Sequence, residues 1–525
     1  MASQEESFYI NWHTIIQHHA AHQPAKVFIE SIDQDKRITF GEIKEWCGRI
    51  ANFLKTMKIT EKDKVTLIGN NSIETMIIYF GVLYYGAILN PIFSEESEEN
   101  IYRIANLVQT PLILYDKALS HGAEKRVSAR WISYSAFFEN TAKDDSLSAL
   151  LKGQPTKFED HQGDKNDMAE IVYTSGTTEL PKGIVISREA LFFMVDEISD
   201  RTGITEKDRV LEYRAYNWLS SQLLMILTSM MKGCTIYLGK KFSRTKFPGW
   251  LKKYDITVSS GVPAVFSMLV NQPVPLTKSD VPSLRYMTSS SAPLPVEIHL
   301  KFEEMYGISI NQMMGMSEAG WIVGNSPAKR KIGSVGFPLK HKEIFFRSED
   351  GKRCKPGETG EMVVKGRAMG SCYLRGDGTL DSFPKNGFAT GDLGFMDEEG
   401  YVHITGRKKD LIIRGGINIS PMEITSRILE YQGVSEVATI GVPDKIYGEE
   451  VVCFVVKQSG SGISADEIIS HCKKTLPDFK VPKKIIFMDV LPRNQRAKVA
   501  KNDLLKLYEQ ENKWKLETSQ QRLQK

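Results

Sequence analysis

Apolar residues along this chain alternate between helical spacing and short continuous runs. Thr39 and Glu42 match the capping box that starts a helix, and the amphipathic pattern after them predicts a helix to about Met57. Short apolar runs at residues 64–68 and 112–115 predict strands. Because helices that alternate with strands are typical of parallel sheets, the pattern predicts an α/β architecture.

One stretch, residues 75–93, has no formally charged side chain and is long enough to raise the question of a membrane span. It contains Gly86, Asn90 and Pro91, which do not suit a continuous apolar helix. We therefore expect a buried helix that turns at Gly86 into a short strand, and no integral membrane segment.

The pattern changes near residue 400, where short strand signals follow one another closely. A helix is predicted at about residues 421–431, and Ser464 with Glu467 forms a second capping box. Strands are predicted around it at residues 401–405, 411–414, 437–442, 451–456 and 485–488. These signals predict a large domain over residues 1–408 and a small α+β domain over residues 409–525.

Composition and charge narrow the class of protein. The 525 residues have ordinary globular composition, and 68 basic against 64 acidic side chains give a net charge of +4. This balance gives no electrostatic reason to expect a nucleic-acid partner. Six cysteines lie far apart, as in proteins of a reducing compartment, and the first residues do not resemble a secretory signal. We expect a cytoplasmic protein.

The most informative segment is a loop between two predicted strands, Tyr173-Thr174-Ser175-Gly176-Thr177-Thr178-Glu179-Leu180-Pro181-Lys182-Gly183. Glycine and small hydroxyl residues offer backbone N–H and O–H donors to a polyphosphate, and a lysine adds a point charge. The segment is not a Walker A loop, because it lacks the Gly-Lys-Ser/Thr ending. Taken by itself, it could equally be a polar surface loop.

The loop resembles the phosphate loop of the adenylate-forming superfamily, which includes acyl-CoA synthetases, luciferases and peptide-synthetase adenylation domains. Four more segments resemble motifs of this family in the family's order, at residues 314–318, 390–392, 406–416 and 492–501. The closest similarity is to crotonobetaine/carnitine–CoA ligase-like and short- to medium-chain acid–CoA ligases. The resemblance extends over nearly the whole chain.

The resemblance implies a fold and a reaction. The expected fold is a large N-terminal region of stacked α/β sheets with a β-barrel-like subdomain, followed by a small mobile α+β domain. The expected reaction joins a carboxylate to ATP, which gives an acyl-adenylate and pyrophosphate. CoA then gives the acyl-CoA and AMP. ATP, Mg²⁺ and CoA are therefore the implied cofactors and co-substrates.

The resemblance also assigns roles to individual residues. It implies that Lys498, Glu318 and Thr174 are catalytic, that Glu318 and Thr174 bind magnesium, and that Lys409 is the hinge between the domains. Glu318 is a hard oxygen donor of the kind Mg²⁺ prefers. The expected nucleotide-binding residues are Thr174, Ser175, Gly176, Thr177, Thr178, Lys182, Ser291, Ala292, Pro293, Met313, Met314, Gly315, Met316, Ser317, Asp392, Arg407 and Lys498. The expected CoA channel contains Gly415 and Gly416, and the expected acid pocket contains Tyr216, Asn217, Trp218, Ser289 and Gly315.

Three positions depart from the family pattern. Glu179 stands where a glycine is usual, Met314 replaces the tyrosine that packs on adenine, and Ala497 replaces the glycine before the catalytic lysine. None of them removes a charged catalytic group. A histidine pair, His18 and His22, is spaced by one helical turn, but a zincin motif would need glutamate at position 19, which is His19.

The identity of the acid is the least determined part of the prediction. The aromatic residues around Asn217 favour a small aromatic, cyclic or medium-length acid over a long straight chain. No carrier-protein segment follows, which favours free CoA as the acceptor. Two alternatives stay open: an adenylating enzyme that loads a partner carrier protein, and a nucleotide-binding protein whose catalysis has decayed. The sequence leaves monomer and homodimer equally open.

Overall fold

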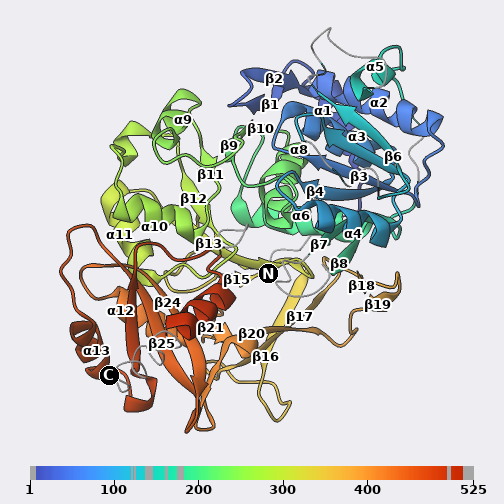
Figure 1. The fold of residues 1–525 in the computed structure, drawn as a ribbon. Helices are drawn as coiled ribbons and strands as arrows, with labels where there is room; N and C mark the ends of the chain where they lie inside the picture. The colour runs from blue at the N-terminus through green and yellow to red at the C-terminus, as the bar shows by residue number, and fades with distance from the viewer. Residues whose placement is uncertain are drawn as a thin grey trace, which may run out of the picture.

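The computed structural model describes residues 8–119, 122, 126–135, 137, 146–159, 163–173, 182–493 and 498–511. A large body holds the first four hundred residues, and a smaller body, orange to red in Figure 1, holds the rest. The large body contains three sheets and the small body contains one. This arrangement confirms the predicted fold class of stacked sheets with a small C-terminal domain.

The first sheet of the large body has eight strands. Its central strands are parallel, and the hairpin that carries the predicted phosphate loop is antiparallel. In spatial order the strands are β19(Leu380–Ser382), β18(Cys372–Leu374), β8(Gly183–Ser187), β7(Met168–Tyr173), β4(Ile88–Phe93), β3(Lys64–Gly69), β5(Leu112–Asp116) and β6(Arg130–Tyr134).

The second sheet has nine strands, mostly parallel, with two antiparallel pairings at one end (β13 with β14 and β14 with β15) and one at the other (β1 with β2). Its order is β15(Phe337–Pro338), β14(Gly320–Gly324), β13(Ile310–Met316), β12(Tyr286–Ser289), β11(Val258–Ser259), β9(Arg209–Glu212), β10(Thr235–Leu238), β1(Val27–Ser31) and β2(Lys36–Thr39).

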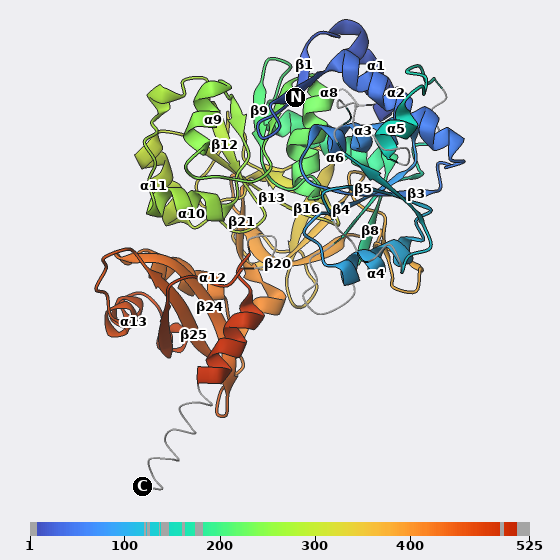
Figure 2. The same ribbon diagram turned by 45° about the horizontal axis from the view of Figure 1, so that its top comes forward.

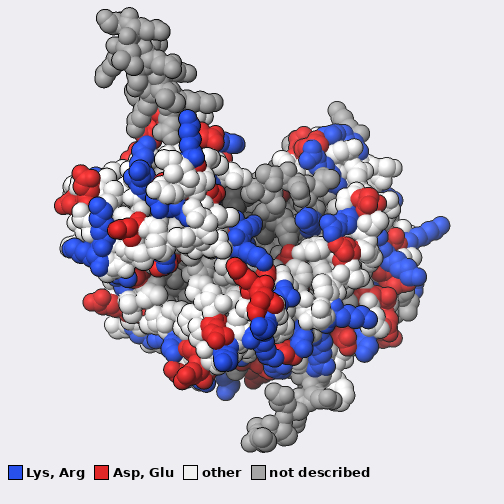
Figure 3. Space-filling view, turned by 90° about the horizontal axis from the view of Figure 1, so that it is seen from below, with Lys and Arg blue, Asp and Glu red and all other residues white. Residues whose placement is uncertain are grey.

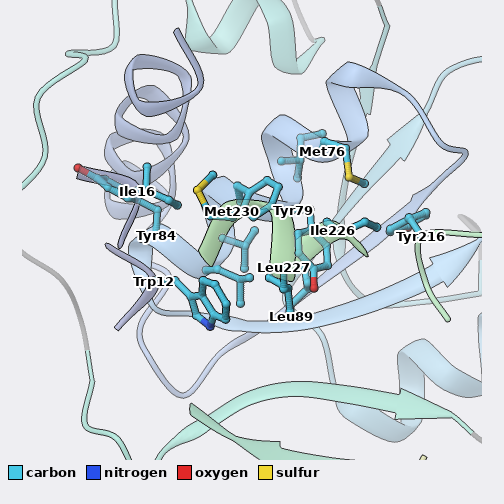
Figure 4. Packing of buried hydrophobic residues seen from close by; sticks show 14 of the residues in the cluster. Trp12, Ile16, Met76, Tyr79, Tyr84, Leu89, Tyr216, Ile226, Leu227 and Met230 are labelled. Atoms are coloured by element: carbon cyan, nitrogen blue, oxygen red, sulfur yellow. The ribbon is translucent and has the colours of Figure 1, made fainter. Parts of the chain in front are cut away.

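Helices pack around these two sheets and share their largest core. Helix α3 is buried along its whole length, which explains the uncharged stretch, and it ends at Gly86, whose φ of 104° turns the chain into β4. Figure 4 shows side chains from α1, α3 and η2 in this core. The helices of the large body are α1(Trp12–His22), α2(Phe40–Thr56), α3(Ile73–Tyr85), α4(Glu98–Val108), α5(Leu147–Leu151), α6(Arg188–Thr202), α7(Leu219–Ser221), the π-helical η2(Gln222–Leu227), α8(Thr228–Lys232), α9(Phe247–Lys253), α10(Pro263–Asn271), η3(Lys278–Asp280) and α11(Val296–Tyr306).

The subdomain predicted to be barrel-like is a four-stranded antiparallel sheet with its own apolar core. It is made of β16(Lys342–Arg347), β17(Gly360–Gly366), β20(Phe388–Met396) and β21(Val402–Arg407). A bridge between Gly336 and Val402 joins it to the chain beside β15. A buried ion pair between Lys342 and Glu197 ties it to α6.

The small domain begins after β21 and packs its helices on a five-stranded sheet. Its elements are η4(Lys408–Asp410), β22(Ile412–Arg414), β23(Ile417–Ile419), α12(Pro421–Leu429), β24(Val434–Asp444), β25(Gly448–Lys457), α13(Ala465–Lys473), η5(Asp478–Lys480), β26(Lys484–Met488) and a last helix over residues 501–511.

The small domain lies beside α10 and α11 of the large body (Figure 2). The Asn271 side-chain amide donates to the Ser435 carbonyl at 3.4 Å, and the Ser420 hydroxyl donates to the Thr405 carbonyl beside the connection. Acidic and basic side chains are interspersed over the face in Figure 3, in keeping with the small net charge. Among the described helices, none combines the length and the apolar character needed to cross a bilayer.

Candidate active site

The predicted phosphate loop connects β7 to β8. Tyr173 and Gly183 face each other at the mouth of this hairpin, and the Tyr173 hydroxyl donates to Asn90 Oδ1 at 2.7 Å. Lys182 is exposed at the end of the loop. The other predicted residues of this loop lie outside the described residues: Thr174, Ser175, Gly176, Thr177 and Thr178, as well as the unusual Glu179.

A second segment follows β12, at the carboxyl end of a parallel strand, where α/β folds commonly place ligand sites. Ser289 ends the strand and is buried. Ser291 has a φ of 74°, a left-handed conformation that costs energy in a residue other than glycine. Ala292 is partly buried and Pro293 is exposed, so the loop reaches the surface. Strain at a strand end is typical of functional sites.

The neighbouring strand β13 carries the predicted adenine segment. Met313 is buried in the core of the large body, so its side chain packs inward. Met314 and Met316 are partly buried against the antiparallel subdomain. Gly315 is exposed at a register shift opposite Trp321, where a Cβ atom would lie 2.4 Å from the Gly320 carbonyl oxygen. Glycine is therefore required at this position, because a side chain would clash with the backbone of β14.

Glu318 lies just after β13 and Ser317, and it is buried apart from 8% of its surface. The Tyr373 hydroxyl donates to Glu318 Oε1 at 2.9 Å. Partial burial, and then the charge of Glu318, raise the pKa of Tyr373, so the phenol stays protonated and keeps donating. A carboxylate oriented in this way fits a magnesium ligand. Tyr373 was not predicted as a site residue, since 55 residues separate it from Glu318.

Asp392 and Arg407 face each other across β20 and β21. Gly391 has a φ of 73°, and the Asp392 amide donates to the Thr390 hydroxyl at 3.1 Å, which presents the carboxylate. Arg407 Nε donates to Asp392 Oδ1 at 2.6 Å. Partial burial alone would lower the pKa of Arg407, but the Asp392 carboxylate raises it above its ordinary value. The two predicted nucleotide-binding residues therefore form one ion pair.

The remaining predicted residues belong to the small domain. Lys409 is exposed in η4, directly after Arg407 and Lys408. Gly415 and Gly416 form the two-residue turn between β22 and β23, with φ values of 58° and 83° that suit a type I′ hairpin. Lys498 is exposed and precedes Val499, which pairs with Arg493. Ala497 lies outside the described residues.

The predicted acid-pocket residues Tyr216, Asn217 and Trp218 directly precede α7, which contacts β14. Arg214 shows that α7 and the segment after β12 are neighbours, because its guanidinium donates to the Ser220 carbonyl and to the Ser290 hydroxyl, each at 3.3 Å. Trp218 and Asn217 are partly exposed. In the described part of the chain, Asn217 Oδ1 and Ser289 Oγ are buried atoms without a hydrogen-bond partner.

Tyr216 occupies a different environment from Asn217 and Trp218. It is fully buried in the largest core (Figure 4), and its hydroxyl lies 2.7 Å from the Leu67 carbonyl and 3.0 Å from the Ile92 carbonyl. The sequence analysis placed Tyr216 in the acid pocket with Asn217 and Trp218, whereas the structure places its side chain in the core. The hydroxyl contacts both β3 and β4, so Tyr216 anchors the following segment, Asn217 and Trp218, to the first sheet.

The histidines near the N-terminus lie on helix α1, far along the chain from these residues. His18 and His22 pack their rings 4.1 Å apart at the surface, and the described residues contain no group of three or more side chains suited to hold a metal ion. His13 is buried and stacks on Tyr84.

Comparison with known proteins places this arrangement in a family. The model of the AMP-binding enzyme matches residues 16–374, and that of the AMP-binding enzyme C-terminal domain matches residues 423–498. The long-chain-fatty-acid–CoA ligase FadD13 of Mycobacterium tuberculosis is 30% identical over 482 residues, which are 90% of this chain and 94% of the relative. The indoleacetate–CoA ligase of Aromatoleum aromaticum is 29% identical over 499 residues, covering 94% and 97%.

Among solved structures, ATP-bound MatB from Rhodopseudomonas palustris superimposes with a TM-score of 0.87 at 28% identity, covering 95% of this chain and 99% of that one. The relatives match over both domains, and the motifs in the sequence occur in the order the family requires. The chain belongs to the AMP-binding enzyme family and is an ATP-dependent acid–CoA ligase, as its sequence predicted.

Proposed function

We propose that the acid activated by this ligase is a small aromatic, cyclic or medium-length acid that carries a polar group. The supporting observation is the pair of unpartnered buried atoms, Asn217 Oδ1 and Ser289 Oγ. A purely aliphatic acid would leave both without a hydrogen bond, at a cost of about 1–3 kcal/mol for each group. A substrate hydroxyl would donate to Asn217 Oδ1 and accept from the Ser289 hydroxyl, and a substrate amine would donate to Asn217 Oδ1.

Trp218 supports an upper limit on the size of the acid. Its backbone begins α7, and its amide donates to the Ala215 carbonyl at 3.0 Å, so the segment that would carry the ring into the pocket wall is held by its own turn. The relatives include a long-chain-fatty-acid–CoA ligase and an indoleacetate–CoA ligase, so similarity alone does not choose the acid. A bulky Trp218 side chain in the pocket wall favours a compact, aromatic acid.

In the first half-reaction, this chain's residues bind and orient the two reactants. Asp392 accepts hydrogen bonds from the ribose hydroxyls, and Arg407 binds the phosphates. Lys498 places its ammonium between the carboxylate and the α-phosphate, where negative charge develops. Glu318, together with Thr174, would hold a magnesium ion. When bound, this ion neutralises the charge of the departing pyrophosphate. Met314 would pack on the adenine ring.

In the second half-reaction, the turn at Gly415 and Gly416 would line the approach of the CoA thiol. Both this turn and Lys498 belong to the small domain, so each half-reaction needs its own orientation of that domain. Rotation about Lys409 would supply the two orientations. We also propose a cytoplasmic location, because all six cysteines are free.

A panel of carboxylic acids with ATP, Mg²⁺ and CoA tests this proposal, with AMP release and the mass of the thioester as readouts. We expect the highest kcat/KM for compact acids with a hydroxyl or amino group. Asn217→Ala should reduce kcat/KM about tenfold for these acids and leave unsubstituted acids of the same size nearly unchanged. Trp218→Ala should shift activity toward longer acids. A preference for long unsubstituted chains in the parent enzyme would contradict the proposal.

The two alternatives have their own tests. Acyl transfer to a purified phosphopantetheinylated carrier protein, with none to free CoA, would identify a carrier-loading enzyme. The absence of acid-dependent exchange between pyrophosphate and ATP with every acid in the panel would identify a nucleotide-binding protein with decayed catalysis.

A further inference from the structure

An ion pair connects the segment of Lys498 to the connection between the domains. Lys501 Nζ lies 2.9 Å from Asp410 Oδ2, with 42% and 29% of the two side chains exposed. Lys501 begins the last helix, three residues after Lys498. Asp410 ends η4, next to the predicted hinge residue Lys409. The pair therefore links two segments that are 91 positions apart and that both serve the proposed reaction.

The Lys498 segment also makes contacts with the sheet of the small domain. The Ala500 amide donates to the Pro492 carbonyl at 2.8 Å, and Leu504 is fully buried in an apolar cluster of that domain. An ion pair between Arg493 and Glu436 holds the other side of the segment. These contacts fix the segment to its own sheet, whereas the ion pair with Asp410 fixes it at the end of the small domain that adjoins β20.

Asp410 is close to those residues. Element η4 follows β21 without a gap and packs against β20, which carries Asp392. Asp410 and Glu318 are both near enough to contribute, after Asp392, to the raised pKa of Arg407. The carboxylate that Lys501 contacts thus lies beside the ion pair of Arg407 and Asp392.

We propose that Lys501 is a positioning residue for the adenylation step, acting through its ion pair with Asp410. This inference rests on the proposed function of Lys498. Three residues of chain span at most about 10 Å, so fixing Lys501 at Asp410 restricts the region that the Lys498 ammonium can reach. Without the pair, the segment samples more positions and fewer of them place the ammonium at the α-phosphate. Thioester formation does not use Lys498, so it should not depend on the pair.

The test removes the charge of Lys501 with a polar, unbranched side chain, as Lys501→Gln, and compares the two half-reactions. Acid-dependent exchange of pyrophosphate with ATP should fall about tenfold in kcat, with the KM for ATP within about twofold. Thioester formation from supplied acyl-adenylate should stay within about twofold. Lys501→Arg should recover most of the exchange rate, since it restores the cation. The double variant, Asp410→Asn with Lys501→Gln, should be no slower than the slower single variant, because each substitution removes the same ion pair.

Lys506→Gln is the matched control. Lys506 is on the same helix, with 72% of its side chain exposed, and it forms its own ion pair with Asp503 at 3.9 Å. It should leave both half-reactions unchanged. Equal losses in Lys501→Gln and Lys506→Gln, or equal losses in the two half-reactions of Lys501→Gln, would overturn the proposal.

A readout independent of chemistry separates this inference from the proposed function. Amide hydrogen exchange over residues 408–414 should be faster in Lys501→Gln than in the parent and unchanged in Lys506→Gln. If the parent shows no pyrophosphate exchange with any acid, the proposed function fails. The amide hydrogen exchange experiment still tests the ion pair in that case. Unchanged amide exchange in Lys501→Gln would overturn the proposed role of the pair whatever the activity.

Discussion

The hydrogen bond from Tyr373 to Glu318 gives a direct test of the magnesium site. Tyr373→Phe removes the hydroxyl that lies 2.9 Å from Glu318 Oε1 and keeps the ring, which packs edge-on against Phe383 at 4.8 Å between centroids. A hydrogen bond to a charged group contributes about 1.5–3 kcal/mol. Tyr373 is partly exposed, so we take the lower end, which corresponds to about tenfold in an equilibrium constant.

We expect the Mg²⁺ concentration for half-maximal pyrophosphate exchange to rise about tenfold in Tyr373→Phe, because the metal-binding carboxylate is no longer held in one orientation. Isothermal titration of Mn²⁺ into the enzyme with a non-hydrolysable ATP analogue should show the same weakening. Tyr286→Phe is the control, since it loses a comparable buried hydrogen bond, to the Thr202 carbonyl at 2.6 Å, away from this site.

Two results would refute this reasoning. The first is an unchanged metal requirement with a lower kcat, which would place Tyr373 at the reacting groups. The second is an equal rise in the metal requirement in Tyr286→Phe, which would show a general loss of stability.

The other predictions concern the catalytic lysine, the adenine contact and a buried carboxylate. Lys498→Ala should lower the rate of adenylation about 10²-fold or more, while thioester formation from supplied acyl-adenylate persists. Lys409→Pro should do the reverse, because proline fixes φ at the hinge. Equal losses in both half-reactions in both variants would contradict two orientations of the small domain. Met314→Tyr should lower the KM for ATP without a change in acid preference, since an aromatic ring stacks better on adenine; a changed acid profile would place Met314 in the acid pocket. Burial raises the pKa of Glu170 to about 8, with Gln222 donating to it at 2.6 Å. The folded state then holds the extra proton between pH 4.5 and 8, so this group's contribution to stability falls as pH rises, by at most about 1.4 kcal/mol per pH unit. Glu170→Gln should therefore raise the melting temperature more at pH 8 than at pH 5, and an equal change at both values would show that Glu170 is not protonated in the folded protein.

Local sequence signals predicted the elements well. The capping boxes of Thr39 with Glu42 and of Ser464 with Glu467 both form, because the two partners are only three residues apart and need no distant contact. The uncharged stretch at residues 75–93 is a buried helix, a turn at Gly86 and a strand, as its glycine and proline indicated.

Contacts between segments far apart in the chain could not be predicted from the sequence. Nothing local to Tyr373 indicates that its hydroxyl meets Glu318, because the meeting depends on how β18 of one sheet lies against the end of β13 in another. For the same reason, Tyr216 could not be separated from Trp218. Both are aromatic residues in one short segment, and only the packing of β3 and β4 shows that Tyr216 is a core residue.

The ion pair of Arg407 with Asp392 has a consequence for product release. The Asp392 side chain is only 4% exposed, so a departing AMP would strand a buried carboxylate if no cation were at hand. Arg407 Nε donates to Asp392 Oδ1 at 2.6 Å, so the cation that compensates this charge belongs to the protein itself. If Asp392 binds the ribose, as proposed above, AMP can leave without exposing an unpaired buried carboxylate. Each turnover then resets the site for the next ATP.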